Sequence, residues 1–298
     1  MEQLKQLLTA ADIAYKENEP LSAHCTFKIG GPARLFVQPV DRAQLCRAVA
    51  LCKAQGVRYY LLGNGSNILF ADEGYNGAVL SISSMQDAVE VHGTQLTAGA
   101  GVRLSTLCKT ALEHGLTGLE FAYGIPGTVG GAVYMNAGAY GGEMKDVLTT
   151  VQYLTAEGEI KEATVAELDL RYRHSIFEEN GGCILSAQFA LAPGEPEAIR
   201  TKMDELMAKR LDKQPLDKPS AGSTFKRPAG AFAAALIDQC GLRGYRHGGA
   251  AVSEKHCGFV VNLGGATCAD VLALCEEVRA IVKEKTGYDL EKEIRVVR

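Results

Sequence analysis

The chain has 298 residues, of which 33 are glycine, nine are cysteine and none is tryptophan. Its 31 basic and 35 acidic residues give a net charge of −4, which argues against a broad electrostatic surface for nucleic acid. No segment approaches the roughly 20 consecutive apolar residues that a membrane-spanning helix requires, so no membrane span is expected.

The first third of the chain predicts alternating helices and strands. Leu4, Leu7 and Leu8 recur at helical spacing, so residues 1–15 are expected to form a surface helix and not a secretion signal. A second helix is predicted over residues 42–55. Strands are predicted at 57–62 and 78–82, and an antiparallel hairpin is predicted within residues 88–101.

The middle third predicts a helix followed by a set of strands. The helix spans residues 104–112 and ends before Gly115. Near Leu191 the composition changes, and APGEPEAIR indicates a linker that leads into a helix with Pro196 in its first turn. The predicted strands are 147–154, 159–164 and 183–191.

The last third predicts two helices and a closing strand. The segment AAALIDQ forms a short helix that ends at Gly241. A longer helix begins at Thr267, where Asp270 completes a capping box, and it ends at Gly287. Residues 293–297 predict the closing strand. Together these patterns predict an α+β fold.

The nine cysteines show no C-x-x-C spacing, and their number is odd. We therefore expect reduced thiols in the cytoplasm, most of them acting as small core residues. Cys240, His247, His256 and Cys257 lie near one another in the sequence, but their spacing matches no zinc motif. No metal is expected, and the histidines are interpreted as ordinary core or surface residues.

Glycines gather in loops at residues 30–31, 63–65, 99–101 and 124–142. Glycine loops suit phosphate because bare backbone lets N–H groups approach the oxygens, although a tight turn is the simpler explanation of any single loop. A P-loop is excluded because no GK[ST] occurs. A Rossmann site is excluded because GNGSNI lacks the third glycine and leads into strand-like residues instead of a helix.

The long segment 124–142 carries the stronger signal for a ligand. Thr128 can cap a short helix that starts beside Gly127, and the N–H groups of its first turn would suit a diphosphate. Two such loops, about 60 residues apart in the sequence, favour a long and doubly negative ligand such as a dinucleotide.

Seven motifs along residues 20–298 occur in the order seen in the UDP-N-acetylenolpyruvoylglucosamine reductase family, and the chain resembles that family on these residues. Members are FAD enzymes of bacterial cell-wall peptidoglycan synthesis. The motifs are CTFKIGGPARLFVQP, LGNGSNIL, GIPGTVGGAVYMNAGAYGGE, YRHSIF, PSAGSTFKRP, VSEKHCGFVVN and KEIRVV.

The resemblance implies an α+β protein with a two-lobed FAD-binding domain of the vanillyl-alcohol-oxidase type over residues 1–195. The two lobes are expected over about 1–83 and 84–195. A smaller α+β substrate-binding domain is expected over 196–298, with its last strand returning to the active-site cleft. The implied contacts to FAD are Gly63, Asn64, Gly65, Ser66, Asn67, Gly127, Thr128, Gly130, Gly131, Asn136 and Gly138.

The implied reaction passes a hydride from NADPH to FAD and then to the enolpyruvyl group of a UDP-amino sugar, giving UDP-N-acetylmuramate. Hydride addition beside a carboxylate builds negative charge on that carboxylate, so a cation or an acid must meet it. A separate group must protonate the adjacent carbon. The partners implied are therefore two small molecules, NADPH and the UDP-amino sugar.

The motifs imply which residues would do this work. Arg173 matches the catalytic arginine, Ser223 the proton donor and Glu293 the acid near the carboxylate, although each one alone indicates an ordinary surface or turn residue. Lys213, Lys226 and Arg227 would help to make the setting of Ser223 positive. Arg295 lies two residues after Glu293, which predicts the same strand face. The implied substrate-binding residues are Lys213, Arg227 and Arg295.

The chain resembles the shorter form of the family. Residues 174–213 contain no tyrosine and no room for the inserted tyrosine loop of the other form, which also has asparagine in place of Arg227. Two alternatives remain open at this point. One is a different FAD enzyme on the same scaffold, such as an oxidase of hydroxyl substrates. The other is a catalytically idle protein that binds a UDP-sugar or nucleotide.

Overall fold

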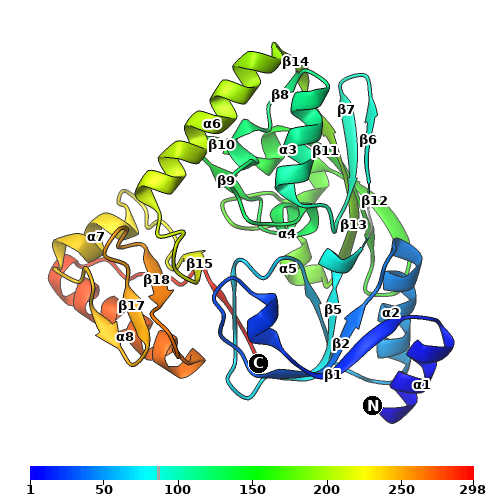
Figure 1. The fold of residues 1–298 in the computed structure, drawn as a ribbon, viewed down its shortest axis with the longest axis horizontal. Helices are drawn as coiled ribbons and strands as arrows, with labels where there is room; N and C mark the ends of the chain where they lie inside the picture. Colours follow the sequence, from blue (N-terminus) through cyan, green and yellow to red (C-terminus); the bar gives the residue numbers. More distant parts are fainter. Residues whose placement is uncertain (86–87) are drawn as a thin grey trace. The chain divides into compact units, whose positions relative to one another are not determined.

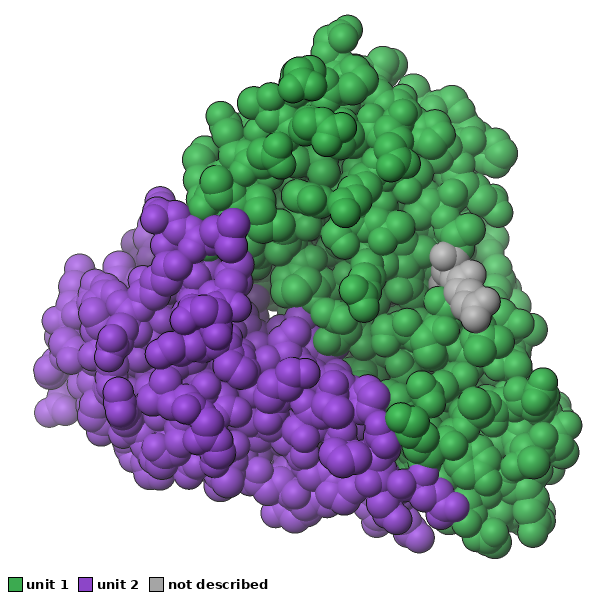
Figure 2. Space-filling view, in the orientation of Figure 1, with its two compact units in different colours: residues 1–16, 35–64, 77–210 green, residues 17–34, 65–76, 211–298 purple. Residues whose placement is uncertain are grey.

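The structure, a computed structural model, describes residues 1–85 and 88–298 (Figure 1). The expected lobe at 84–195 includes residues 86–87, which lie outside the described residues. The chain forms two compact units, and each unit draws on three separate stretches of sequence (Figure 2). Unit 1 comprises Met1–Lys16, Leu35–Asn64 and Gly77–Arg210, and unit 2 comprises Glu17–Arg34, Gly65–Asn76 and Leu211–Arg298. The expected domain boundary at residue 195 stays a prediction.

Unit 1 contains a five-stranded antiparallel sheet with the order β12-β11-β13-β7-β6. The hairpin predicted within residues 88–101 is confirmed, because β6 pairs with β7 and Gly93 takes the positive φ of 63° that the tight turn requires. The three strands predicted between residues 147 and 191 are also confirmed. The bounds are β6 Val89–His92, β7 Gln95–Gly99, β11 Leu148–Leu154, β12 Ile160–Thr164 and β13 Cys183–Ala190.

The helices of unit 1 follow the predicted apolar spacing. Leu4 and Leu8 of α1 are buried, and Asp41 caps α2 by accepting a hydrogen bond from the backbone N–H of Gln44. Pro196 is the first residue of α6, as predicted. The bounds are α1 Glu2–Ala10, α2 Arg42–Ala54, α3 Leu104–Glu113, α4 Val129–Tyr134, α5 Phe177–Asn180 and α6 Pro196–Lys213, whose last three residues belong to unit 2.

A second sheet has the order β1-β2-β5-β3, and β3 runs parallel to β5. Two further short antiparallel pairs, β9 with β10 and β8 with β14, lie in unit 1. Short 3-10 helices connect several elements. The bounds are β1 Ala14–Pro20, β2 Pro32–Gln38, β3 Tyr59–Leu62, β5 Tyr75–Ser81, β8 Leu116–Thr117, β9 Gly138–Ala139, β10 Gly142–Glu143 and β14 Ala192–Pro193.

Unit 2 contains a four-stranded antiparallel sheet, β15-β18-β17-β16, and two helices. The start and end predicted for helix α8 are confirmed, because Thr267 and Asp270 form the capping box and Gly287, with φ 78°, ends the helix. The sheet strands were not predicted, since each has only two to four residues. The bounds are β15 Ser220–Ser223, β16 Arg246–His247, β17 Ala250–Val252, β18 Phe259–Asn262, α7 Ala233–Gln239 and α8 Cys268–Thr286.

The closing strand of the chain is β19 (Arg295–Val297), which pairs in parallel with β4 (Ile68–Phe70) within unit 2. Strand β4 directly follows the GNGSN loop, so the absence of a Rossmann-type helix there is confirmed. The prediction that Glu293 and Arg295 share a strand face is wrong, because the strand starts at Arg295 and Ile294 forms a bend before it. The alternation of side chains along a strand therefore does not extend back to Glu293.

Eight of the nine cysteines are buried, which confirms that they act as small core residues. Burial raises the pKa of several of these thiols, including that of Cys52 to about 11, so they stay protonated and unreactive near neutral pH. No helix among the described residues combines the length and the apolar character needed to cross a bilayer.

Candidate active site

Two of the glycine loops meet within unit 1. Strand β3 ends at Leu62, and Gly63 then lies so close to Thr128 that an added Cβ would be 2.8 Å from the threonine Oγ1. The next residue, Asn64, donates from Nδ2 to the carbonyl oxygen of Pro126 at 2.8 Å. The start of the GNGSN loop and the 124–138 loop are thus neighbours.

The N-terminus of α4 differs from its prediction in one respect. Thr128 caps the helix as expected, because its Oγ1 accepts the N–H of Gly131 at 3.3 Å. However, the N–H of Val129 donates to Val102 and that of Gly130 donates to Ala100. The expectation that these N–H groups remain available for a diphosphate is therefore wrong.

The glycines of this region divide into two kinds. At Gly130, an added Cβ would lie 2.9 Å from the Cβ of Ala100, and at Gly138 it would lie 2.8 Å from the Cγ of Glu143. Internal packing therefore requires both glycines. At Gly127 and Gly131 the nearest atoms would lie 3.7 Å and 3.5 Å away, which is ordinary contact. Neither has a positive φ. The protein itself therefore does not fill the space beside these two glycines.

Asn136 is fully buried and serves as a junction between three segments. Its Nδ2 donates to Glu143 Oε2 at 2.8 Å and to the carbonyl oxygen of Arg171 at 3.1 Å. Its Oδ1 accepts the N–H of Lys145 at 3.0 Å. Both amide hydrogens are committed to the protein itself, so the side chain acts on this region by fixing the surrounding loops.

Arg173 adopts a left-handed backbone with φ 57°. Among residues 1–85 and 88–298, seven non-glycine residues have positive φ, and four of them fall between positions 136 and 173. This conformation costs a non-glycine residue about 1–2 kcal/mol and persists only where neighbouring contacts impose it. The guanidinium lies over the Tyr172 ring at 5.0 Å, and Nη2 donates to the carbonyl oxygen of Gly138 at 3.5 Å.

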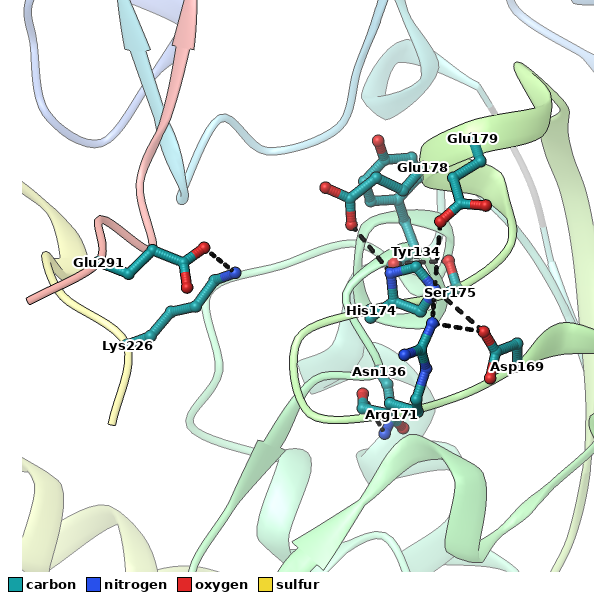
Figure 3. A network of polar contacts seen from close by, with 10 residues as sticks. All are labelled: Tyr134, Asn136, Asp169, Arg171, His174, Ser175, Glu178, Glu179, Lys226 and Glu291. Atoms are coloured by element: carbon teal, nitrogen blue, oxygen red, sulfur yellow. Dashed lines mark hydrogen bonds and ion pairs between the residues drawn. The ribbon is translucent and has the colours of Figure 1, made fainter. Parts of the chain in front are cut away.

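The contacts that hold this loop are polar (Figure 3). Arg171 donates to Asp169 at 2.6 Å and lies 3.0 Å from Nε2 of His174. The buried Ser175 donates to the carbonyl oxygen of Tyr134, at the end of α4, at 2.7 Å. Together with the bond from Asn136 to Arg171, these contacts fix the chain on both sides of Arg173.

In unit 2, Ser223 is the last residue of β15 and is half-buried. It pairs with Phe259 of β18 after a register shift between Ser220 and Ser223, a stretch in which Gly222 has a φ of 75°. The next residue, Thr224, is buried and donates its N–H to the carbonyl oxygen of Gly258 at 2.8 Å. Its Oγ1 also accepts the N–H of Val260 at 2.9 Å. The end of β15 is thus fixed on the side of β18.

A short antiparallel pairing joins residues 224–226 to residues 291–293. The N–H of Glu293 donates to the carbonyl oxygen of Thr224, and that of Lys226 donates to Glu291, both at 2.8 Å. Phe225 and Lys292 form the bridge between them. Glu293 therefore lies beside the residue that follows Ser223, although 70 positions separate Ser223 and Glu293 in the sequence.

The GNGSN loop contributes to the same neighbourhood in unit 2. Asn67 donates from Nδ2 to the carbonyl oxygen of Glu293 at 3.3 Å, and its own carbonyl oxygen accepts the N–H of Arg295 at 2.9 Å. Thr26 donates from Oγ1 to the carbonyl oxygen of Ser220 at 2.6 Å, and its N–H donates to Gly65. Asn67 and Thr26 thus tie this loop to both segments that carry the predicted catalytic residues of unit 2.

The predicted cations differ in their surroundings. Lys213 ends α6 and is exposed. Arg227 is also exposed, and its guanidinium lies over the Phe232 ring at 4.7 Å. Lys226 forms an ion pair with Glu291 at 2.6 Å, so its charge is offset and the expectation that it makes the setting of Ser223 positive is weakened (Figure 3).

Sequence reasoning missed the roles of Thr26, Thr224 and Asn67 as residues that position the loops. The structure places Arg173 in unit 1, with the first part of the GNGSN loop and the 124–138 loop. It places Ser223, Glu293 and Arg295 in unit 2, with residues 65–67.

Two family models match the chain, one on each side of the linker. The model described as an FAD binding domain matches residues 33–164. The model described as the C-terminal domain of UDP-N-acetylenolpyruvoylglucosamine reductase matches residues 214–297. The order of an FAD-binding domain and a distinct C-terminal domain in a mixed α+β fold, implied by the motifs, is confirmed.

Curated relatives and a solved structure match almost the whole chain. The UDP-N-acetylenolpyruvoylglucosamine reductase of Agathobacter rectalis is 49% identical over 94% of this chain and 93% of its own length. The reductase of Caldanaerobacter subterraneus is 46% identical over 100% of this chain and 97% of its own length. The crystal structure of the Thermus caldophilus reductase superposes with a TM-score of 0.79 at 34% identity, covering 96% of this chain and 99% of that one. The chain therefore belongs to the UDP-N-acetylenolpyruvoylglucosamine reductase family.

Proposed function

We propose that the chain reduces the enolpyruvyl group of UDP-N-acetylenolpyruvoylglucosamine with NADPH, giving UDP-N-acetylmuramate for peptidoglycan synthesis. Family membership supports the reaction class. The observation that carries the assignment of residues is the pairing of 224–226 with 291–293, which places the proposed acid Glu293 beside Thr224, the residue that follows the proposed proton donor Ser223. A backbone ladder fixes such positions more firmly than a surface loop would.

FAD is held, in this proposal, by the GNGSN loop and by the 124–138 loop. The residues present fit such a group, because Gly127 and Gly131 leave space that the protein does not fill. When bound, FAD supplies the redox chemistry by taking a hydride from NADPH and delivering it to the enolpyruvyl methylene carbon. Gly63, Gly65, Gly130 and Gly138 shape the loops, whereas Gly127 and Gly131 admit the ligand to the backbone. The remaining predicted contacts position those loops or donate to the ligand. They are Asn64, Ser66, Asn67, Thr128 and Asn136.

Arg173 binds the carboxylate of the enolpyruvyl group. A guanidinium can hold both carboxylate oxygens, and it stabilises the negative charge that builds there as the methylene carbon gains hydrogen. The left-handed backbone supports this role, since such strain is typical of sites where a side chain must be held in one direction. The polar contacts of Asn136 and Ser175 maintain that direction.

Ser223 donates the proton to the carbon next to the carboxylate, and Glu293 stabilises the charge that develops there. The half-buried positions of both residues support the proposal, because water competes less with a donor that is partly removed from solvent. Lys213, Arg227 and Arg295 are proposed to bind the UDP-amino sugar. The buried thiols suit the reducing cytoplasm, in which precursors of this kind are made.

The test is product formation by the purified protein. With FAD, NADPH and UDP-N-acetylenolpyruvoylglucosamine, mass spectrometry should detect a product heavier than the substrate by two hydrogens, formed in equal amount to the NADPH consumed. NADPH consumption that produces hydrogen peroxide and leaves the UDP-sugar intact would contradict the proposal and favour an oxidase.

A further inference from the structure

Arg210 occupies an unexpected position on helix α6. The buried residues Ile199, Met203 and Leu206 define the inward face of this helix. Arg210 follows Met203 by seven positions and Leu206 by four, so it lies on that same face. An arginine at a position where helical spacing predicts an apolar residue indicates a use for its charge.

The Arg210 side chain is half-buried, and one of its nitrogen atoms lacks a partner among the described residues. Its Nε is buried and makes no hydrogen bond within residues 1–85 and 88–298. No carboxylate of this described part of the chain pairs with it, and burial lowers its pKa, only partly countered by Tyr140. Buried polar groups are nearly always paired, and an arginine keeps its charge in proteins, so an anion from outside the chain is the natural partner.

The immediate surroundings belong to the glycine segment 124–142. An added Cβ at Gly124 would lie 3.0 Å from Cδ of Arg210 and 3.6 Å from its Nη1. The glycine therefore makes room for the arginine. Tyr140, whose electrostatic influence raises the pKa of Arg210, is at the turn of the β9–β10 hairpin, and the Gly138 of this hairpin accepts the hydrogen bond from Arg173. Arg173 and Arg210 are thus both associated with one hairpin of unit 1.

We propose that Arg210 binds a phosphate group of a ligand held at the 124–142 segment. This inference rests on the proposed function, in which Arg173 takes the carboxylate of the substrate, so that the anions left for Arg210 are phosphates. Planar guanidinium donors match phosphate oxygens, and the partly buried setting strengthens the bond. FAD, NADPH and the UDP-amino sugar all carry a diphosphate, and the experiment distinguishes these sources.

The experiment compares Arg210→Met with Lys209→Met, which removes an exposed cation from the same turn of α6. Titration calorimetry measures FAD binding to the apoprotein, and then UDP and NADP⁺ binding to the flavin-loaded protein. Arg210→Met should weaken one of these three ligands by about tenfold or more, whereas Lys209→Met should change all three by less than about twofold. The affected ligand identifies the source of the phosphate.

Two further variants keep the test decisive. Gly124→Ala retains the charge but displaces Arg210, and it should weaken the same ligand. If Arg210→Met does not fold, Arg210→Lys keeps the charge and the stem without the planar donors, and it should still weaken that ligand. Unchanged affinity for all three ligands in the variants that fold would overturn the proposal. Because binding is measured without turnover, failure of the reductase reaction would contradict the proposed function and leave this result standing.

Discussion

At the scale of single residues, the loop around Arg173 shows how neighbouring contacts hold a strained backbone in place. The left-handed backbone there is opposed by about 1–2 kcal/mol of steric energy. Hydrogen bonds from Asn136 to Arg171 and from Ser175 to Tyr134 flank the residue and offset that energy. The loop so fixed holds the backbone of Arg173, and its guanidinium lies over the Tyr172 ring.

Replacement of Ser223 by alanine tests the proposed proton donor. The variant should retain flavin reduction by NADPH, because no proton from Ser223 enters that half-reaction. Reoxidation by UDP-N-acetylenolpyruvoylglucosamine should slow by about 10²–10⁴-fold, which is the usual contribution of a general acid. Stopped-flow absorbance measures both halves, with Ser220→Ala on the same strand as control. Equal slowing of both halves would contradict the role.

Some residue assignments follow from the sequence and others do not. The motifs single out Arg173, Ser223 and Glu293, and helix signals identify Thr128 and Thr267 as caps. The bonds of Asn136 and the pairing of Thr224 with Glu293 could not be predicted, because they join segments far apart in the chain. Local sequence patterns carry no information about such partners.

At the scale of elements, helix α4 contains two neighbouring glycines with different roles. Gly130 packs against Ala100 in the loop after β7, whereas a Cβ added at Gly131 would make only ordinary contact. Gly130→Ala should destabilise the apoprotein by about 1–3 kcal/mol, because the added methyl group would clash with Ala100. Gly131→Ala should leave the stability of the apoprotein unchanged or raise it by up to about 1 kcal/mol, since alanine favours helix. Its affinity for FAD should instead fall by about tenfold or more.

Thermal unfolding of the apoproteins and titration with FAD measure the two effects of these substitutions. If Gly131→Ala bound FAD as tightly as the unchanged protein, the space beside Gly131 would have no role in holding the cofactor. If Gly130→Ala were as stable as the unchanged protein, the packing explanation for Gly130 would fail.

The turn before β18 predicts a dependence of stability on pH. Burial lowers the pKa of His256 from its ordinary value of 6.5, and its Nδ1 accepts the N–H of Gly258 at 3.1 Å. The unfolded chain therefore binds the proton more readily than the folded one. The contribution of neutral His256 to the free energy of unfolding is complete above about pH 6.5. It is lost as the pH falls through the lowered pKa of His256 in the folded state.

The variant His256→Asn tests this dependence, because asparagine supplies an acceptor that does not titrate. Chemical unfolding between pH 7.5 and about 5 should show a smaller loss of stability in the variant than in the unchanged protein. His92→Asn, on the exposed strand β6, is the control. Identical pH profiles for His256→Asn and the unchanged protein would show that His256 does not cause the loss.

Elements with strong local signals were predictable, whereas short paired strands were not. Helix α8 has a capping box, a regular apolar face and a terminal glycine, and the β6–β7 hairpin has alternation and a tight turn. Strands β16 and β17 have two and three residues, too few for any period to emerge. Glu293 was placed in a strand because the pattern EIRVV continues through it, but the bend at Ile294 interrupts that strand.

At the scale of the whole molecule, family membership and the local geometry of each unit lead to one account. The chain matches an FAD binding domain followed by the C-terminal domain of the reductase family. Each compact unit fixes part of the proposed machinery: unit 1 holds Arg173 and the glycine loops, and unit 2 holds Ser223, Glu293 and the end of the GNGSN loop. The account therefore assigns proposed functional residues to each unit.

The most direct test of the central claim is the visible absorption of the purified, FAD-loaded protein under anaerobic conditions. Addition of NADPH should bleach the flavin, and subsequent addition of UDP-N-acetylenolpyruvoylglucosamine should restore its colour in proportion to the substrate added. A flavin that NADPH does not bleach, or a bleached flavin that the UDP-sugar does not reoxidise, would contradict the account.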